Sequence, residues 1–249
     1  MNRFYEKLNV PKNCIVDNTV FKKAFLENAD LLAFDKKIIN EHIKKVTWKY
    51  CLKPDTINIQ PYKSDERDYL EIEIMEVQLN EDSKIKRIAE IIMRAIPYPI
   101  LLVLVKDNQI QLVTGDMRKN LSDSSKVTVE DFSFTGWIDL NSEDIFRDNL
   151  FAELNIPKLS YINFYEMYKD ITAKVNLYNV SKIKGSVVNT ENVSDSDIKY
   201  SYDRIKSIET EILALKSKIK KATSIKEKVE LNIQIDKLKK ESEELKSKI

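Results

Sequence analysis

Between residues 198 and 249, apolar residues return every three or four positions, and this periodicity constrains the fold more than any other feature. The first run contains Ile198, Tyr202, Ile205, Ile208, Ile212, Leu215 and Ile219, and the second contains Leu231, Ile235, Leu238, Leu245 and Ile249. Such spacing places apolar side chains on one face of a helix. Between the runs, Ser224 and Glu227 have the spacing of a capping box. The pattern predicts two helices that fold back as an antiparallel coiled coil.

The residues before this segment alternate between strand and helix periods. Strands are expected over Val46–Leu52, Tyr69–Leu79, Ile100–Val105, Ile110–Thr114 and Phe132–Leu140, and helices over Val20–Asn28, Lys36–Lys44, Ser83–Ile96, Ser142–Leu150 and 160–179. Asp107-Asn108 is a turn dipeptide, so the strands on either side of it should pair antiparallel. We therefore predict an α+β fold, in which a mixed, largely antiparallel sheet is flanked by helices and followed by the helical hairpin.

Composition also predicts the domain boundaries. The stretch 186–197 concentrates Ser, Asn, Thr and Asp, as linkers do. The prediction is a globular domain over residues 1–185, whose last long helix covers about 160–179, a polar linker over 186–197 and the hairpin over 198–249.

Glycine content excludes the common phosphate-binding loops. The chain has three glycines, Gly115, Gly136 and Gly185, and no two of them are close in sequence. Dinucleotide fingerprints and P-loops need clustered glycines, because the backbone must approach the phosphates closely. The charged residues cancel to a net charge of +1, which gives no electrostatic case for a nucleic-acid or membrane partner.

The expected location is the cytoplasm. Cys14 and Cys51 are the only cysteines, and a reducing compartment would keep both as thiols. Residues 1–10 have no signal-peptide core, and the longest apolar run, Ile100–Val105, is too short to span a bilayer. No membrane association is expected.

The most informative group of polar residues is Glu71, Glu73 and Glu76, all in the longest expected strand. Alternation places Glu71 and Glu73 on one face and Glu76 on the other. Two interpretations fit. Paired carboxylates could bind Mg²⁺, as in restriction-type nucleases, although the lysine of those nucleases is missing because Glu73 and Gln78 occupy the positions two after Glu71 and Glu76. The interpretation we favour is an exposed strand face, charged to prevent edge pairing.

Other polar residues predict little chemistry. His42, the only histidine, is expected on a helix surface with a local partner, and both cysteines are expected as small buried side chains. Asp116, Arg118 and Lys119 follow an expected strand, where they could form either a ligand site or a plain turn. No catalytic residue, metal site or cofactor is therefore assigned.

Lysines gather at the expected tip of the hairpin, namely Lys216, Lys218, Lys220, Lys221, Lys226 and Lys228. Residues 198–249 contain 14 Lys and Arg against 9 Asp and Glu, whereas the rest of the chain contains 27 against 31. A basic arm of this kind fits a solvated spacer or a dimerisation arm, which we favour, or contact with DNA or RNA.

Several short motifs lie between residues 4 and 140, namely Pro11 with Phe21-Lys22-Lys23, Val46-Thr47-Trp48-Lys49-Tyr50 with Leu52-Lys53-Pro54, Ile72-Glu73-Ile74, and Ala95-Ile96-Pro97-Tyr98-Pro99. In these motifs the segment from about 4 to 140 resembles a bacterial family known as domain of unknown function 4391. Members of this family are often encoded beside DNA methyltransferases and helicases of phage-defence loci. The resemblance implies an accessory subunit of such a system, and it supplies no active site.

These observations predict a non-catalytic adaptor that docks on a helicase or methyltransferase. Two alternatives stay open. One is a divergent nuclease that binds Mg²⁺ through Glu71, Glu73 or Glu76, and the other is a homo-oligomer assembled through the hairpin.

Overall fold

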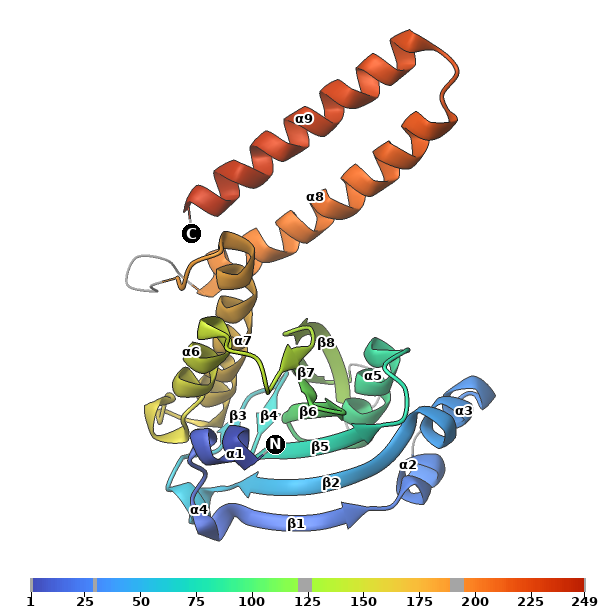
Figure 1. Ribbon diagram of the computed structural model, residues 1–249. Coiled ribbons are helices and arrows are strands. Elements are labelled where there is room, and N and C mark those ends of the chain that lie inside the picture. Colours follow the sequence, from blue (N-terminus) through green and yellow to red (C-terminus); the bar gives the residue numbers. More distant parts are fainter. Residues whose placement is uncertain (1, 29–30, 121–126, 189–194, 249) are drawn as a thin grey trace. The chain divides into compact units, whose positions relative to one another are not determined.

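The computed structural model describes residues 2–28, 31–120, 127–188 and 195–248 (Figure 1). The chain forms two compact units, Met1–Val175 and Asn176–Ile249. Within the described ranges, no helix combines the length and the apolar content that crossing a bilayer requires.

The first unit is built on a seven-stranded mixed sheet. Its strands are β1 (Ile15–Val20), β2 (Ile43–Leu52), β5 (Ile72–Leu79), β6 (Ile100–Lys106), β7 (Gln109–Lys119), β8 (Val127–Phe134) and β9 (Ile138–Asp139). The order is β1-β2-β5-β6-β7-β8, and β9 pairs with the start of β7. Only β5 and β6 are parallel, so the predicted largely antiparallel sheet is confirmed. Two short strands, β3 (Tyr62–Lys63) and β4 (Asp68–Tyr69), form a separate ladder.

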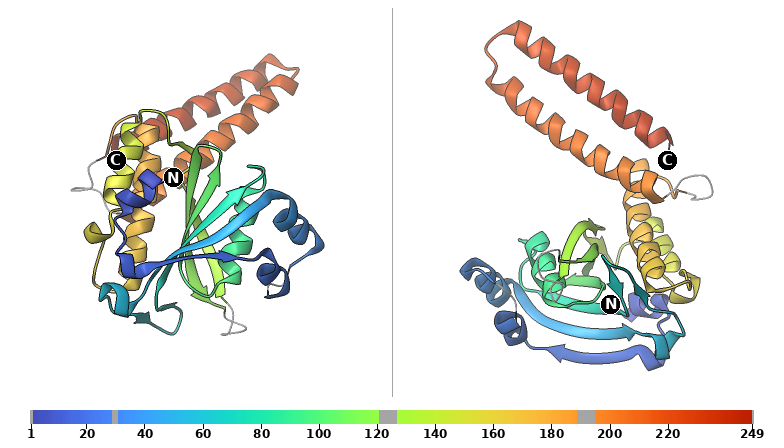
Figure 2. Two further views of the ribbon diagram at one scale, coloured as in Figure 1. Left: turned by 60° about the horizontal axis from the view of Figure 1, so that its bottom comes forward. Right: turned by 180° about the vertical axis from the view of Figure 1, so that it is seen from behind.

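Helices form two groups around this sheet (Figures 1 and 2). They are α1 (Asn2–Leu8), α6 (Ile145–Glu153) and the start of α7 (Phe164–Lys184) in one group, and α2 (Lys22–Asn28), α3 (Ala33–His42) and α5 (Ile85–Ala95) in the other. A one-turn helix, α4 (Pro54–Ile57), follows β2. Helix α5 connects the parallel strands β5 and β6, as a parallel pair requires. Its apolar stripe, which includes Ile88, Ala89 and Ile92, is buried as the sequence predicts.

A bulge in β7 explains why two tyrosines are buried. The register of β7 on β8 shifts between Thr114 and Asp116, around Gly115. The Gly115 N–H donates to the Tyr168 hydroxyl at 3.1 Å, and that hydroxyl donates to the Ile100 carbonyl at 2.8 Å. The Met117 N–H donates in the same way to the hydroxyl of Tyr69, which is also buried, at 3.0 Å. Side-chain oxygens therefore satisfy backbone groups that the bulge takes out of the ladder.

The prediction for the first helix is partly wrong. Asn18 and Thr19 directly precede the predicted helix and are residue types that often form an N-cap, but they lie in β1, where they pair with Trp48 and Thr47 of β2. The helix itself, α2, begins later, at Lys22. Pairing with β2 supplies backbone hydrogen bonds along the whole strand, and this outweighs a local capping pattern.

The strand predicted over Phe132–Leu140 is divided into β8 and β9. Gly136 lies between them with a φ of +69°, a left-handed conformation that breaks a strand and that glycine adopts at little cost. The preceding strand is longer than predicted, because β7 continues past Gly115 to Lys119. Asp116, Arg118 and Lys119 therefore lie within a strand rather than in a turn.

The second unit contains the predicted helical hairpin. Helix α8 (Asp195–Lys221) and helix α9 (Ile225–Lys248) pack against each other and are joined by Ala222-Thr223-Ser224. Near the start of α8, Arg204 donates from two nitrogens to Glu241 of α9, at 2.6 and 2.9 Å. This paired contact fixes the alignment of the two helices.

The division between the units falls inside α7, before the predicted linker. Leu177 and Val180 from the end of α7 share a buried cluster with Val188 and with Ile198 and Ile205 of α8. This shared apolar cluster makes the end of α7 part of the second unit. Most of the predicted linker, residues 189–194, lies outside the described residues, and residues 195–197 are already helical.

The Tyr168 hydroxyl offers a test of this packing. We expect Tyr168→Phe to lower the free energy of unfolding by about 1–3 kcal/mol, because it leaves the Ile100 carbonyl and the Gly115 N–H without partners. Urea unfolding measures the change. The control is Tyr161→Phe, at a side chain that is 45% exposed, and an equal loss in both variants would contradict the proposed role.

Candidate functional site

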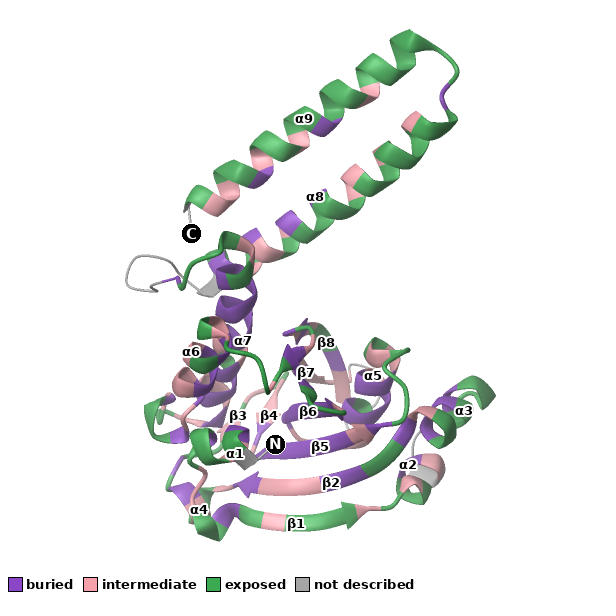
Figure 3. Ribbon diagram, in the orientation of Figure 1, coloured by how far each residue is buried: buried purple, intermediate pink, exposed green. Residues whose placement is uncertain are grey.

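The three glutamates that the sequence singles out lie on or beside β5, and two of them are buried. Glu73 is 2% exposed and Glu76 is 8% exposed, while Glu71, just before the strand, is half-buried. β5 pairs with β2 on one edge and with β6 on the other. The predicted exposed face of an edge strand is therefore wrong, because no edge of β5 is open to solvent (Figure 3).

A β-bulge in β2 decides which side chains meet Glu73. The register of β2 on β5 shifts between Trp48 and Tyr50, so Lys49 is an extra residue in β2. In a regular strand, Trp48 and Cys51 would point to opposite faces, because they are three positions apart. The extra residue brings both onto the face of Glu73 and places Lys49 and Tyr50 on the other face.

Glu73 is the centre of a small buried cluster. The Trp48 Nε1–H donates to one carboxylate oxygen of Glu73 at 2.5 Å, and the Cys51 Sγ lies 3.6 Å from the other. The same sulfur lies 3.6 Å from a carboxylate oxygen of Glu71. One ligand atom from each of Cys51, Glu71 and Glu73 falls within 4.8 Å of the other two. The fold thus brings together a thiol and two carboxyl groups.

Burial sets the protonation of this cluster. Removal from water raises the pKa of Glu73 to about 8, and the neighbouring charge of Glu71 acts in the same direction. Burial also raises the pKa of the Cys51 thiol, with Glu73 and Glu71 adding to the effect. Both groups therefore hold their protons at neutral pH. Because metal ligands must be deprotonated, the cluster would bind a cation more weakly at pH 7 than at higher pH.

Glu76 belongs to a different site on the opposite face of β5. The Tyr5 hydroxyl of α1 donates to one of its carboxylate oxygens at 2.8 Å, and the Gln78 side chain donates to the other at 3.0 Å. Burial, followed by the charge of Glu76, raises the pKa of the Tyr5 hydroxyl above its ordinary value. The structure therefore brings Glu71 and Glu73 together but does not bring Glu76 to them.

A basic side chain of β2 also lies away from the cluster. Lys49 is on the Tyr5 side of the sheet, where its ammonium group lies 2.5 Å from an oxygen of Asp17 and 5.4 Å from the centre of the Tyr5 ring. The nuclease pattern needs a lysine beside its paired carboxylates. The bulge thus turns the nearest lysine of β2 to the wrong face for that chemistry.

The remaining polar residues singled out by the sequence form local contacts. The His42 Nδ1 lies 3.2 Å from the Ser83 hydroxyl. Asp116 accepts hydrogen bonds from Arg67 at 2.6 and 3.3 Å, and Lys119 forms an ion pair with Asp68 at 3.1 Å. Arg118 pairs with an acidic residue of β8. Asp116 and Lys119 therefore join β7 to β4 and the loop before it, and this linking role accounts for their position.

The six predicted lysines lie at one end of the hairpin. Lys216, Lys218, Lys220 and Lys221 end α8, Lys226 and Lys228 begin α9, and all six are exposed. Residues 212–240, which we call the distal half of the hairpin, contain nine lysines and three acidic residues. This excess of positive charge is a local property, since the whole chain is close to neutral.

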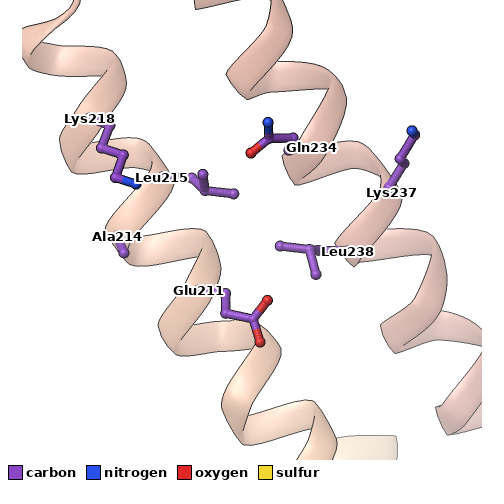
Figure 4. A pocket seen from close by; sticks show the side chains of 7 residues that line it. All are labelled: Glu211, Ala214, Leu215, Lys218, Gln234, Lys237 and Leu238. Atoms are coloured by element: carbon purple, nitrogen blue, oxygen red, sulfur yellow. The ribbon is translucent and has the colours of Figure 1, made fainter.

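A groove opens between α8 and α9 in the distal half (Figure 4). It has a volume of about 430 Å³, and the side chains of Glu211, Leu215, Gln234 and Leu238 point into it. Ala214, Lys218 and Lys237 complete its lining. Leu215 and Leu238, both in the predicted seam of the coiled coil, are only half-buried. The seam is therefore incomplete here.

Four apolar side chains of the distal half are exposed, and sequence reasoning missed them. Ile225, Val229 and Ile233 are 81%, 51% and 50% exposed on α9, and Leu213 is 66% exposed on α8. Ile225, Val229 and Ile233 are spaced by four residues, so they follow one stripe of the helix. Their exposure could have been predicted, because these apolar residues fall outside the predicted seam of the coiled coil.

Comparison with known families gives one match. The model of a family described as "Domain of unknown function (DUF4391)" matches residues 8–241. The match extends beyond the segment 4–140 on which the resemblance depended, and it includes α8 and most of α9. No curated protein and no solved structure matches the chain.

The raised pKa of Glu73 predicts how stability changes with pH. Between about pH 4.5 and 8, the unfolded chain ionises this carboxyl while the folded chain keeps it protonated. The carboxyl therefore lowers the free energy of unfolding by up to about 1.4 kcal/mol per pH unit as pH rises through this window. We expect Glu73→Gln, which retains an acceptor for Trp48, to remove that slope.

Urea unfolding at pH 5, 6.5 and 8 measures the slope for the wild type and for Glu73→Gln. Glu6→Gln, at an exposed glutamate of α1, is the matched control and should keep the wild-type slope. An identical pH dependence in the wild type and in Glu73→Gln would show that Glu73 ionises normally in the folded protein.

Proposed function

The chain belongs to the DUF4391 family, and from this premise we propose that it is a non-catalytic accessory subunit of a bacterial DNA-modification or antiphage-defence complex. It docks on a helicase or methyltransferase subunit. The observation that carries the proposal is the distal half of the hairpin, where exposed apolar side chains lie among lysines. Exposed apolar groups that recur along a helix are typical of protein interaction surfaces.

The arrangement of the glutamates supports a non-catalytic role. Glu73 is protonated at neutral pH and hydrogen-bonded to Trp48, and Glu76 accepts from Tyr5 on the opposite face. General acid–base and metal chemistry both need groups that converge on one reacting atom. Glu71 and Glu73 lie together beside Cys51, but Glu76 is on the opposite face and the sheet buries Glu73, whereas the surface of the hairpin is accessible to a partner.

Capture of the tagged full-length chain from its bacterial host, followed by mass spectrometry, tests the proposal. We expect a helicase or methyltransferase to co-purify with the wild type. Val229→Ser combined with Ile233→Ser should reduce its recovery by at least about tenfold, because truncating apolar side chains at an interface weakens binding.

The control variant for this capture is Ile145→Ser combined with Ile162→Ser, at two residues of the first unit that are 69% and 72% exposed. It should retain the partner. Recovery of this chain alone would contradict the adaptor role, and a mass above the monomer in light scattering would then favour a homo-oligomer. Truncation at residue 195 is a poorer test, because it would uncover Leu177, Val180 and Val188.

One specific observation favours a second candidate function, a metal-dependent nuclease. The carboxyl groups of Glu71 and Glu73 are close enough to bind one ion through oxygen atoms, which are the ligands Mg²⁺ takes, whereas the neighbouring Cys51 thiol is not such a ligand. This candidate predicts DNA cleavage with Mg²⁺ or Mn²⁺ that increases through about pH 8, as Glu73 ionises, and that Glu73→Gln abolishes while Glu6→Gln does not. If DNA stays intact with either ion between pH 7 and 9, the nuclease candidate is removed.

A further inference from the structure

The two helices of the hairpin pack against each other through buried residues such as Ile208 and Ile235, and the groove lies beside this contact. At the base, Arg204 and Glu241 connect α8 to α9, and Ile208 is 1% exposed. At the tip, Ala222 in the connecting turn is 9% exposed. Between these points Leu215 is half-buried and faces the groove. The groove is therefore partly apolar, and it lies between the Arg204–Glu241 contact and the turn at Ala222.

The lining of this groove has the chemistry of a binding site for a helix. Leu215 and Leu238 point into it from opposite sides and supply apolar contact (Figure 4). Gln234 points in beside them with an amide that can donate and accept hydrogen bonds. Lys218, Lys237 and Glu211 also line the groove, so its charged lining is positive by one. A third helix placed between two others buries its apolar face in this way, as in helix-in-groove recognition.

We propose that this groove binds one amphipathic helix of a protein partner, with apolar side chains on the face that enters the groove and acidic side chains beside them. The proposal rests on the proposed adaptor function and names the partner's chemistry. The acidic side chains are required by charge complementarity, because the distal half of the hairpin contains nine lysines and three acidic residues.

Two other occupants fit the groove less well. A nucleic acid would match the lysines, but its phosphates would leave Leu215 and Leu238 uncovered by apolar groups. A second copy of the hairpin would cover the leucines, but pairing two distal halves would bring lysine-rich surfaces together. An acidic amphipathic helix satisfies both the apolar lining and the positive charge.

Fluorescence anisotropy with the full-length chain and designed peptides tests the proposal. The probe is a labelled helical peptide of about 21 residues, with leucines at the a and d positions of each heptad and glutamates at the flanking positions. We expect it to bind at least about tenfold more tightly than a peptide with lysines in place of the glutamates, or one with serines in place of the leucines. Equal binding of the three peptides, or none, overturns the proposal.

Variants of the chain then locate the site. Leu215→Asn combined with Leu238→Asn should weaken binding of the acidic peptide by at least about tenfold, whereas Ile162→Asn, at an exposed residue of the first unit, should leave it unchanged. Lys218→Glu combined with Lys237→Glu keeps the apolar lining, so it remains informative if the leucine variant unfolds. It should weaken the preference for the acidic peptide by at least about tenfold, and an unchanged preference overturns the proposal.

Competition and capture separate the remaining outcomes. If duplex DNA displaces the peptide equally from the wild type and from the leucine variant, the surface binds nucleic acid and the proposal is overturned. If the wild type and the leucine variant capture the helicase or methyltransferase equally, the groove proposal is contradicted and the adaptor function is supported. If the acidic peptide binds as expected and no such subunit is captured, the groove proposal is supported and the adaptor function is contradicted.

Discussion

The first unit depends on β5, a strand that is hydrogen-bonded on both edges and covered on both faces. A strand in this position normally contains only apolar residues, because each polar group in it must find a partner without help from water. β5 nevertheless contains Glu73 and Glu76. The bulge in β2 brings Trp48 and Cys51 to the first, and α1 supplies Tyr5 to the second. The position of α1 and the irregular pairing of β2 thus give both carboxyl groups hydrogen-bond partners.

Both units expose apolar side chains, Phe21 and Leu32 of the first unit among them, but the hairpin exposes its own beside the groove between α8 and α9. In the first unit, polar groups are enclosed and paired, as Tyr168 shows by satisfying the bulge of β7 from inside the core. In the distal half of the hairpin, Ile225 and Leu213 are exposed, and Leu215 and Leu238 are only half-buried. Buried polar groups avoid a cost in stability when they are hydrogen-bonded, whereas exposed apolar groups contribute stability only when something covers them. This contrast is the physical basis for placing the interaction surface on the hairpin and not on the glutamates.

Much of the architecture could be predicted because it follows from local periodicity. The spacing of Ile88, Ala89 and Ile92 identified α5, and Asp107-Asn108 identified the turn between β6 and β7. Predictions failed where partners distant in sequence decided the outcome. Asn18 and Thr19 have the pattern of a helix cap, but β2 recruits them into β1. For the candidate site, the sequence identified Glu71 and Glu73 correctly as neighbours on one face, but no local signal indicated that Trp48 and Cys51 would reach the same face.

The sequence by itself determined most of the helices and strands, the presence of the hairpin and the family to which the chain belongs, because these depend on the order of residues along the chain. The tertiary structure alone decided that β5 is central and not an edge strand, and that the Glu73 carboxyl is protonated at neutral pH. It also decided that the seam of the hairpin is open at Leu215 and Leu238. Strand order, burial and the separation of two helices arise from contacts between distant residues, and a one-dimensional pattern does not contain them.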